Sequence, residues 1–271
     1  MKKKQHQWVL ITGASSGIGE AFALEMASQG YHVVLVARSE AKLIQLAQRI
    51  ERIYSVKAEV IAADLSEILG PQYIYDECQK RGIRVNTLIN NAGFATHGWF
   101  EQVDGLRQQE EIMLNVVAVT NMTHLFLPGM LEARTGAVIN VSSTAAFQPD
   151  PYMAVYGATK SYVLSFTEAL YEENRGRGIQ FLAICPGATE TSFFDVVNAE
   201  EASVGKRDTP EHVVEVAMKA LQSGKSYAVP GASNYWTAQL ARLLPRRLIL
   251  RVVGGMLRPR QQSSKVQART Q

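Results

Sequence analysis

The chain has 271 residues, of which 46% are hydrophobic and 20% charged, and its formal net charge is +3. This composition excludes a disordered or collagen-like chain and allows a sizeable hydrophobic core. The charge is unevenly distributed. Up to Glu215 there are 18 Lys and Arg against 25 Asp and Glu, whereas from Val216 onward there are 10 Lys and Arg and no acidic residue. A basic tail of this kind indicates an anionic partner.

Short apolar runs alternate with longer stretches of helical period along the chain. The predicted strands are Trp8–Thr12, His32–Ala37, Lys57–Ala62, Thr87–Asn90, Ala137–Ser142, Gln180–Cys185 and Ser226–Val229. The predicted helices are Ile18–Gln29, Glu40–Tyr54, Pro71–Lys80, Leu106–Leu131, Tyr156–Asn174 and Pro210–Gln222. Several strands are continuously apolar, as strands covered on both faces are. We therefore expect a single-domain α/β fold: a Rossmann-type, doubly wound sheet of about seven parallel strands with helices on both faces.

Two segments bear on membrane targeting. Three lysines at positions 2–4 precede an apolar run that is too short for a signal peptide, which predicts a cytoplasmic protein. The stretch from Ile112 to Leu131 has no formal charge, but polar residues such as Asn115 and Thr120 interrupt it. It predicts a buried helix rather than a membrane span.

The first predicted strand runs through a glycine-rich turn into a helix. The turn reads Thr12-Gly13-Ala14-Ser15-Ser16-Gly17-Ile18-Gly19, a Gly-x-x-x-Gly-x-Gly spacing rather than Gly-x-Gly-x-x-Gly. Glycines let backbone N–H groups approach a pyrophosphate at the positive end of the helix dipole. The alternative is a merely tight turn, but the position after the first strand favours a dinucleotide site.

The end of the second strand bears on the choice of cofactor. It carries Ala37-Arg38-Ser39, with no carboxylate to bind a ribose 2′-hydroxyl. A guanidinium binds a phosphate well, so Arg38 favours NADP(H), with Ser15 and Lys42 as further phosphate contacts. The alternative is a solvated strand-end arginine. Asp64 is a candidate for binding the adenine amino group, or simply an acid at a helix N-terminus.

A tyrosine and a lysine four residues apart give the strongest chemical signal. Tyr156 and Lys160 share one helix face, and an adjacent ammonium lowers the pKa of a phenol toward the working range. The phenol then becomes a general acid or base. Upstream, Ser142-Ser143 ends an apolar strand, where a hydroxyl can bind a substrate oxygen at the sheet edge.

Taken in this order, the motifs resemble those of the short-chain dehydrogenase/reductase family. The resemblance extends from Trp8 to Val229 and includes the glycine turn, Asp64, Asn90-Asn91-Ala92-Gly93, Asn115, Ser143, Tyr156 with Lys160, and Pro186-Gly187. It implies a catalytic tetrad of Asn115, Ser143, Tyr156 and Lys160. Ser143 matches rather than Ser142, because the family keeps this spacing to the tyrosine.

The resemblance also implies a role for each group. Tyr156 exchanges the hydroxyl proton, Lys160 lowers the tyrosine pKa and holds the nicotinamide ribose, Ser143 polarises the substrate oxygen, and Asn115 holds a water. Most of Asn90–Gly93 is architecture beside the cofactor. The implied cofactor contacts are Gly13, Ser15, Ser16, Gly17, Ile18, Gly19, Arg38, Asp64, Leu65, Asn91, Ala92, Gly93, Tyr156, Lys160, Pro186, Gly187, Thr189 and Thr191. No metal is expected, because neither Cys78 and Cys185 nor the histidines have ligand spacing.

The substrate is expected to be an apolar ketone, aldehyde or acyl-derived compound. The segment Phe193–Asp208 matches the family's substrate loop, and no arginine or lysine clamp is evident near Ser143 or Tyr156. The aromatic residues expected to line the pocket are Phe94, Trp99, Phe147, Tyr152, Phe193 and Phe194.

A tail, residues 231–271, follows the dinucleotide-binding and catalytic domain, residues 1–230. After Pro245, a helical projection gathers an apolar arc from Leu248 to Leu257, with Arg247, Arg251 and Arg258 opposite. This pattern suits a helix in an anionic membrane interface. The alternatives are packing on its own domain or on a partner subunit. Nucleic-acid binding is not expected, because no recognised module accompanies the arginines.

The favoured function is therefore an NADP(H)-dependent carbonyl reductase or alcohol dehydrogenase, either cytoplasmic or peripheral to a membrane. A catalytically silent cofactor-binding regulator and a membrane-held scaffold are the alternatives. The family resemblance implies a homodimer or homotetramer, paired through the helices that carry Asn115 and Tyr156.

Overall fold

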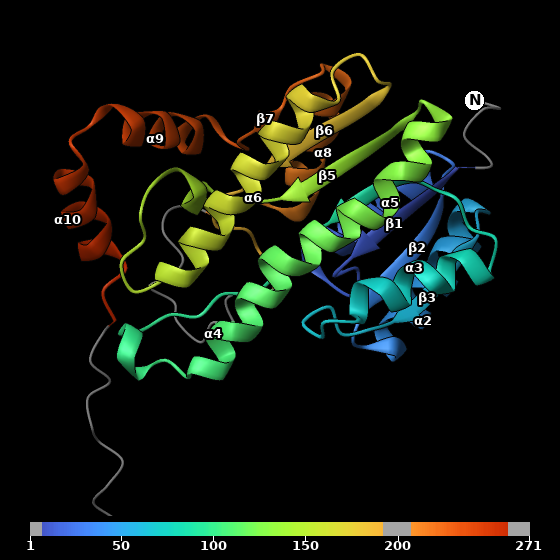
Figure 1. Cartoon of the computed structure of the whole chain (residues 1–271), viewed down its shortest axis with the longest axis horizontal. Coiled ribbons are helices and arrows are strands. Elements are labelled where there is room, and N and C mark those ends of the chain that lie inside the picture. Colours follow the sequence, from blue (N-terminus) through green and yellow to red (C-terminus); the bar gives the residue numbers. More distant parts are fainter. Residues whose placement is uncertain (1–6, 192–206, 260–271) are drawn as a thin grey trace, which may run out of the picture.

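The computed structural model describes residues 7–191 and 207–259. Within these ranges the chain forms one sheet of seven parallel strands in the order β3-β2-β1-β4-β5-β6-β7 (Figure 1). The strands are β1 (Trp8–Thr12), β2 (His32–Ala37), β3 (Ala58–Ala62), β4 (Val85–Asn90), β5 (Gly136–Val141), β6 (Ile179–Ile184) and β7 (Tyr227–Ala228). The predicted α/β, Rossmann-type fold is confirmed.

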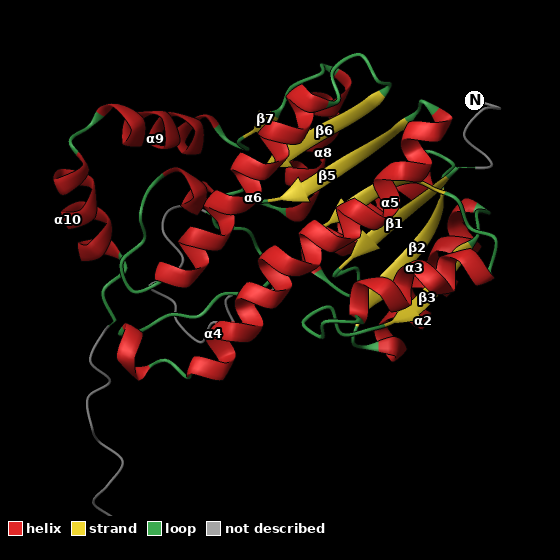
Figure 2. Ribbon diagram, viewed as in Figure 1, coloured by secondary structure: helices red, strands yellow, loops and turns green. Residues whose placement is uncertain are grey.

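Helices cover both faces of the sheet (Figure 2). On one face lie α1 (Gly17–Ser28), α2 (Glu40–Tyr54) and α8 (Pro210–Gln222); on the other lie α3 (Gly70–Lys80), α5 (Val119–Ala133) and α6 (Ala154–Glu173). Phe22 of α1 and Met122 of α5 are fully buried against opposite faces. This double cover is why the central strands are apolar throughout.

One long helical stretch links η1 (Phe100–Gln102) to β5. It consists of α4 (Gly105–Ile112), a π-helical turn η2 (Met113–Ala118) and α5. Among the described residues it is the one helix that is long and apolar enough to cross a membrane by length and composition. Phe126 and Met130 are buried in the core, but only 33% of the apolar stretch is buried, so the helix that the sequence predicts as buried is only partly so.

Two further helices follow the last strand. They are α9 (Ala232–Leu243) and α10 (Arg246–Met256), drawn in red in Figure 1. We call residues 232–257 the C-terminal arm. Val253 and Leu257 pack with Met153 and Tyr156, and the His97 Nε2 atom lies 2.7 Å from the Leu257 carbonyl oxygen. Of the alternatives for the tail, the structure shows packing on its own domain; membrane contact stays a prediction.

Candidate active site

A cleft of about 780 Å³ lies where the strands end. Its walls include residues just after β1, β2, β3, β4, β5 and β6, and β1 lies between β2 and β4, so the strand order reverses there. Such a switch point is where doubly wound folds bind dinucleotides. The predicted site residues that line it are Gly13, Ser15, Ser16, Gly17, Ile18, Arg38, Asp64, Leu65, Asn91, Ala92, Gly93, Ser143, Tyr156, Lys160, Pro186, Gly187, Thr189 and Thr191. Gly19 and Asn115 lie behind this wall.

The glycine turn is packed too closely for side chains. Gly13 and Gly17 have φ of 65° and 59°, a backbone region that favours glycine. A Cβ at Gly17 would lie 2.7 Å from the Thr191 Cγ2 atom. A Cβ at Gly19 would lie 2.2 Å from the Gly13 carbonyl oxygen, so Gly19 supports the turn from inside rather than forming its surface. The exposed backbone of the turn forms a cradle that fits a pyrophosphate.

Asn91 ties the end of β4 to the glycine turn. Its Nδ2 donates to the carbonyl oxygens of Thr12 (2.9 Å) and Gly13 (3.3 Å), and its backbone N–H donates to the Thr12 hydroxyl (2.9 Å). Asn90 similarly donates to Asn140 on β5 (2.9 Å). These bonds fit the architectural role predicted for this segment.

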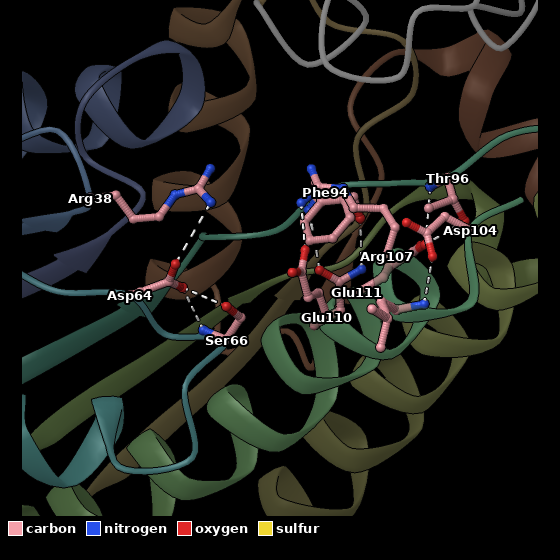
Figure 3. Close-up of polar contacts among 11 residues, drawn as sticks. Arg38, Asp64, Ser66, Phe94, Thr96, Asp104, Arg107, Glu110 and Glu111 are labelled. Carbon is pink, nitrogen blue, oxygen red and sulfur yellow. Dashed lines mark hydrogen bonds and ion pairs between the residues drawn. The ribbon is translucent and has the colours of Figure 1, made fainter.

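Arg38 and Asp64 point toward each other at the β2–β3 end of the cleft (Figure 3). The Arg38 Nη1 atom lies 3.7 Å from Asp64 Oδ2, and the arginine side chain is 70% exposed. Burial alone would raise the pKa of Asp64, but hydrogen bonds from Ser66 and the nearby Arg38 outweigh it and lower the pKa. Lys42 is not among the described residues that line the cleft.

Tyr156 and Ser143 meet in the cleft. Burial raises the pKa of Tyr156, a hydrogen bond with Ser143 opposes the rise, and nearby Asp150 and Glu111 add to it. The expectation that Lys160 lowers this pKa is therefore not met by the geometry: the Lys160 Nζ atom lies 5.7 Å from the centroid of the phenol ring. Ser142 instead donates to the Lys160 carbonyl oxygen (2.8 Å), which leaves Ser143 as the hydroxyl facing the phenol.

Lys160 is a buried cation. Its Nζ donates to the Val141 carbonyl oxygen at the end of β5 (2.9 Å). Burial lowers its pKa to about 8, and the carboxylate of Glu111 opposes that shift. The ammonium is thus close to its own titration range, where it can exchange a proton.

Asn115 lies in the π-helical turn, behind Gly93. Its Nδ2 donates to the Phe94 carbonyl oxygen (2.9 Å) and to the Thr159 hydroxyl (3.1 Å), and its Oδ1 accepts from the Phe94 N–H (3.3 Å). A Cβ at Gly93 would lie 2.9 Å from Asn115 Oδ1 and 3.4 Å from Lys160 Nζ. Asn115 therefore fixes the Gly93–Phe94 loop; its water-holding role stays a prediction.

The sequence profile of the family described as short chain dehydrogenase matches residues 7–202. The chain belongs to the short-chain dehydrogenase/reductase family. Its members are NAD(P)-dependent oxidoreductases, and the chain is an oxidoreductase of this family.

Several family members are similar over most of the chain. A very-long-chain 3-oxoacyl-CoA reductase from Anas platyrhynchos is 35% identical over 84% of this chain and 74% of its own length. Hydroxysteroid dehydrogenase-like protein 1 from Gallus gallus is 32% identical over 91% of this chain and 73% of its own. A short-chain dehydrogenase from Sphingobium yanoikuyae in complex with NADPH has a TM-score of 0.79 and 30% identity, covering 97% of this chain and all of that one.

Two buried carboxyl groups beside the tetrad are not evident as site residues from the sequence motifs. Glu111, four residues before Asn115, accepts from the Thr96 N–H (3.0 Å) and hydroxyl (2.7 Å), as Figure 3 shows, while its Oε1 has no hydrogen-bond partner among the residues that the structure describes. Asp150 accepts from Gln148 (3.0 Å) through one oxygen only. Burial raises the pKa of each to about 7. The i, i+4 relation of Glu111 to Asn115 was the one signal available in the sequence.

Glu111 gives a testable pH dependence. Its pKa is raised from 4.5 to about 7 in the folded chain, so its contribution to stability is fully present below about pH 4.5 and is lost as the pH rises through about 7. We expect Glu111→Gln to raise the unfolding free energy above pH 7, by at most about 3 kcal/mol, and to change it little in acid. Denaturant melts across this range measure it. An equal effect at both ends would contradict the assignment.

The pocket wall differs from the predicted aromatic one. Phe94 lines the cleft, but Trp99 and Tyr152 pack on each other outside it, with ring centroids 5.0 Å apart. Phe147 packs on Tyr227; Phe193 and Phe194 lie outside the described residues. Arg107 also lines the cleft: its guanidinium stacks 3.7 Å from the Phe94 ring centroid and pairs with Glu110 (Figure 3).

Proposed function

We propose that the protein reduces an apolar ketone, aldehyde or acyl-derived carbonyl compound with NADPH, or oxidises the corresponding alcohol with NADP⁺. The observation that carries this proposal is the meeting of Ser143, Tyr156 and Lys160 in one cleft with the glycine cradle. A regulator or a scaffold would have no use for this constellation. Consumption of NADPH with a panel of apolar carbonyl compounds tests the proposal, and a chain that binds NADPH without consuming it would favour the regulator.

The side chains have complementary roles in carbonyl reduction. Bound NADPH supplies a hydride to the carbonyl carbon. Tyr156 donates its phenolic proton to the carbonyl oxygen, and its raised pKa keeps that proton in place beforehand. Ser143, hydrogen-bonded to the phenol, positions the same oxygen. Lys160 places a buried cation in the same cleft, 5.7 Å from the centroid of the phenol ring, and Glu111 favours the charged form of the lysine.

Arg38 supports the choice of NADP(H). Its pair with Asp64 is long and exposed, and pairs of this kind contribute little stability. The guanidinium is therefore available for a 2′-phosphate, which it binds through two parallel hydrogen bonds. The NADPH complex of the similar Sphingobium enzyme is consistent with this choice.

Replacing Arg38 should change the cofactor preference. We expect Arg38→Asp to lower the ratio of kcat/KM for NADPH to that for NADH by roughly 10- to 100-fold, because a charge-assisted contact is lost and a carboxylate that suits NADH is gained. Steady-state kinetics with both cofactors measure the ratio. Arg49→Ala is the matched control, because Arg49 pairs with Glu20 away from the cleft. An unchanged ratio in Arg38→Asp would remove the assignment.

The similar proteins support an apolar substrate. One is named for very-long-chain 3-oxoacyl-CoA and another for hydroxysteroids, and the acyl chain of the first and the ring system of the second are apolar. Homo-oligomer formation and a cytoplasmic or peripheral membrane location remain predictions.

The arginines of α10 support contact with an anionic surface: Arg246, Arg247 and Arg251 are exposed and form no ion pair within residues 7–191 and 207–259. Co-sedimentation with anionic vesicles tests this contact.

A further inference from the structure

We propose that the C-terminal arm forms the distal wall of the substrate pocket and that this wall binds a linear alkyl or acyl chain attached to the reacting carbonyl. The inference rests on the proposed reductase function and specifies its substrate. Three features of the arm carry it: its composition, its connection to the catalytic tyrosine, and the arrangement of its side chains along α10.

The arm contributes an aliphatic wall to the cleft. Its lining residues beyond Thr237 are Ala238, Leu240, Ala241, Leu244, Leu248, Ile249, Val252, Val253, Met256 and Leu257. None of these side chains carries a hydrogen-bonding group. The substrate portion that lies here must therefore be apolar itself, because a polar group would be desolvated without a partner.

This wall begins at the catalytic tyrosine. Val253 and Leu257 pack in one cluster with Tyr156 and Met153. At the other end of the arm, Asn234 packs so closely on Gly187 that a Cβ there would lie 2.6 Å from the Asn234 Nδ2 atom. The arm thus spans from the loop after β6 to the phenol, and a carbonyl at Tyr156 would direct its substituent along α10.

The exposed apolar side chains of α10 lie in a row. Leu248, Val252 and Met256 follow one another at intervals of four residues, which places them on one helix face over about 12 Å. They are 47%, 47% and 53% exposed while lining the cleft. A chain lying along the helix would bury all three, whereas a compact ring system would contact fewer of them.

A homologous series of straight-chain 2-ketones, assayed with NADPH and the full chain, tests the inference. In the wild type we expect kcat/KM to rise by up to about four-fold for each added methylene until the row is filled. Val252→Asp places a carboxylate in the wall and should abolish the rise. Leu250→Asp is the matched control: it introduces the same charge on α10 at a side chain that is 40% exposed but does not line the cleft, so the rise should persist.

The outcomes separate the inference from the reductase function. An equal rise in Val252→Asp and the wild type overturns the aliphatic wall, as does a flat series in a wild type that reduces short ketones. A greater loss for a polycyclic ketone than for a long-chain one overturns the linear occupant. No NADPH consumption with any ketone overturns the proposed function instead. If Val252→Asp fails to bind NADPH, Met256→Trp replaces it, and by filling the row it should move the plateau to shorter chains.

Discussion

Replacing Tyr156 with phenylalanine is expected to lower kcat for carbonyl reduction by about 10²- to 10⁴-fold, the usual contribution of a general acid. The ring keeps its packing against Met153, Val253 and Leu257, so the fold and the cofactor cradle should be unchanged. Only the hydroxyl that meets Ser143 is removed. NADPH affinity, measured by fluorescence titration, should therefore remain nearly that of the wild type.

A neighbouring tyrosine provides the control for this experiment. Tyr152→Phe removes a hydroxyl four residues upstream, on a ring that packs against Trp99 outside the cleft. It should retain turnover. If Tyr156→Phe also retained most of its turnover, Tyr156 would not be the proton donor, and if it lost NADPH binding the residue would be structural instead.

Gly19→Ala is expected to have the second large effect. The added methyl group would lie 2.2 Å from the Gly13 carbonyl oxygen and 2.6 Å from the Asn91 side chain, so the glycine turn has to move. Overpacking of this kind costs about 1–3 kcal/mol, which lowers the Tm by several degrees in a chain of this size. Because the same turn forms the phosphate cradle, NADPH affinity should fall at least about ten-fold. Calorimetry and cofactor titration measure the two effects.

Gly129→Ala is the matched change for this variant. Gly129 also lies in a helix, but a Cβ there would meet no atom of the described part of the chain within 4 Å. Alanine should stabilise α5 by about 0.5–1 kcal/mol and leave NADPH affinity unchanged. If both variants had the same Tm and the same NADPH affinity, the close packing at Gly19 would not be needed for stability or cofactor binding.

Much of the fold can be predicted from the period of the apolar residues and from the residues that start or end helices. The predicted helices Glu40–Tyr54 and Pro210–Gln222 have the observed bounds, the second because Thr209 caps it and Pro210 opens it. Strand ends differ by one or two residues, as at β4, since the pattern of apolar residues does not show where pairing stops. The motif residues meet in one cleft because parallel strands all end at the same edge.

The sequence does not show which polar side chains are buried, nor which surface an apolar helix face packs against. The spacing of Tyr156 and Lys160 predicts a lowered tyrosine pKa, but burial reverses the direction in the structure. The apolar arc of α10 is visible in the sequence, yet an arc that faces a membrane and one that faces a cleft have the same period. Glu111 and Asp150 look like surface acids until the packing around them is known.

The residues proposed for catalysis and those proposed for substrate selection lie in different parts of the chain. The sheet is complete at Ala228, and the residues proposed for hydride and proton transfer all precede it. The arm supplies none of them, but it supplies the aliphatic wall. If the arm selects the substrate as proposed, exchange of residues 232–257 alone is expected to redirect the chemistry to new carbonyl compounds, and trimming the C-terminus to aid purification or crystallisation is expected to remove substrate selectivity.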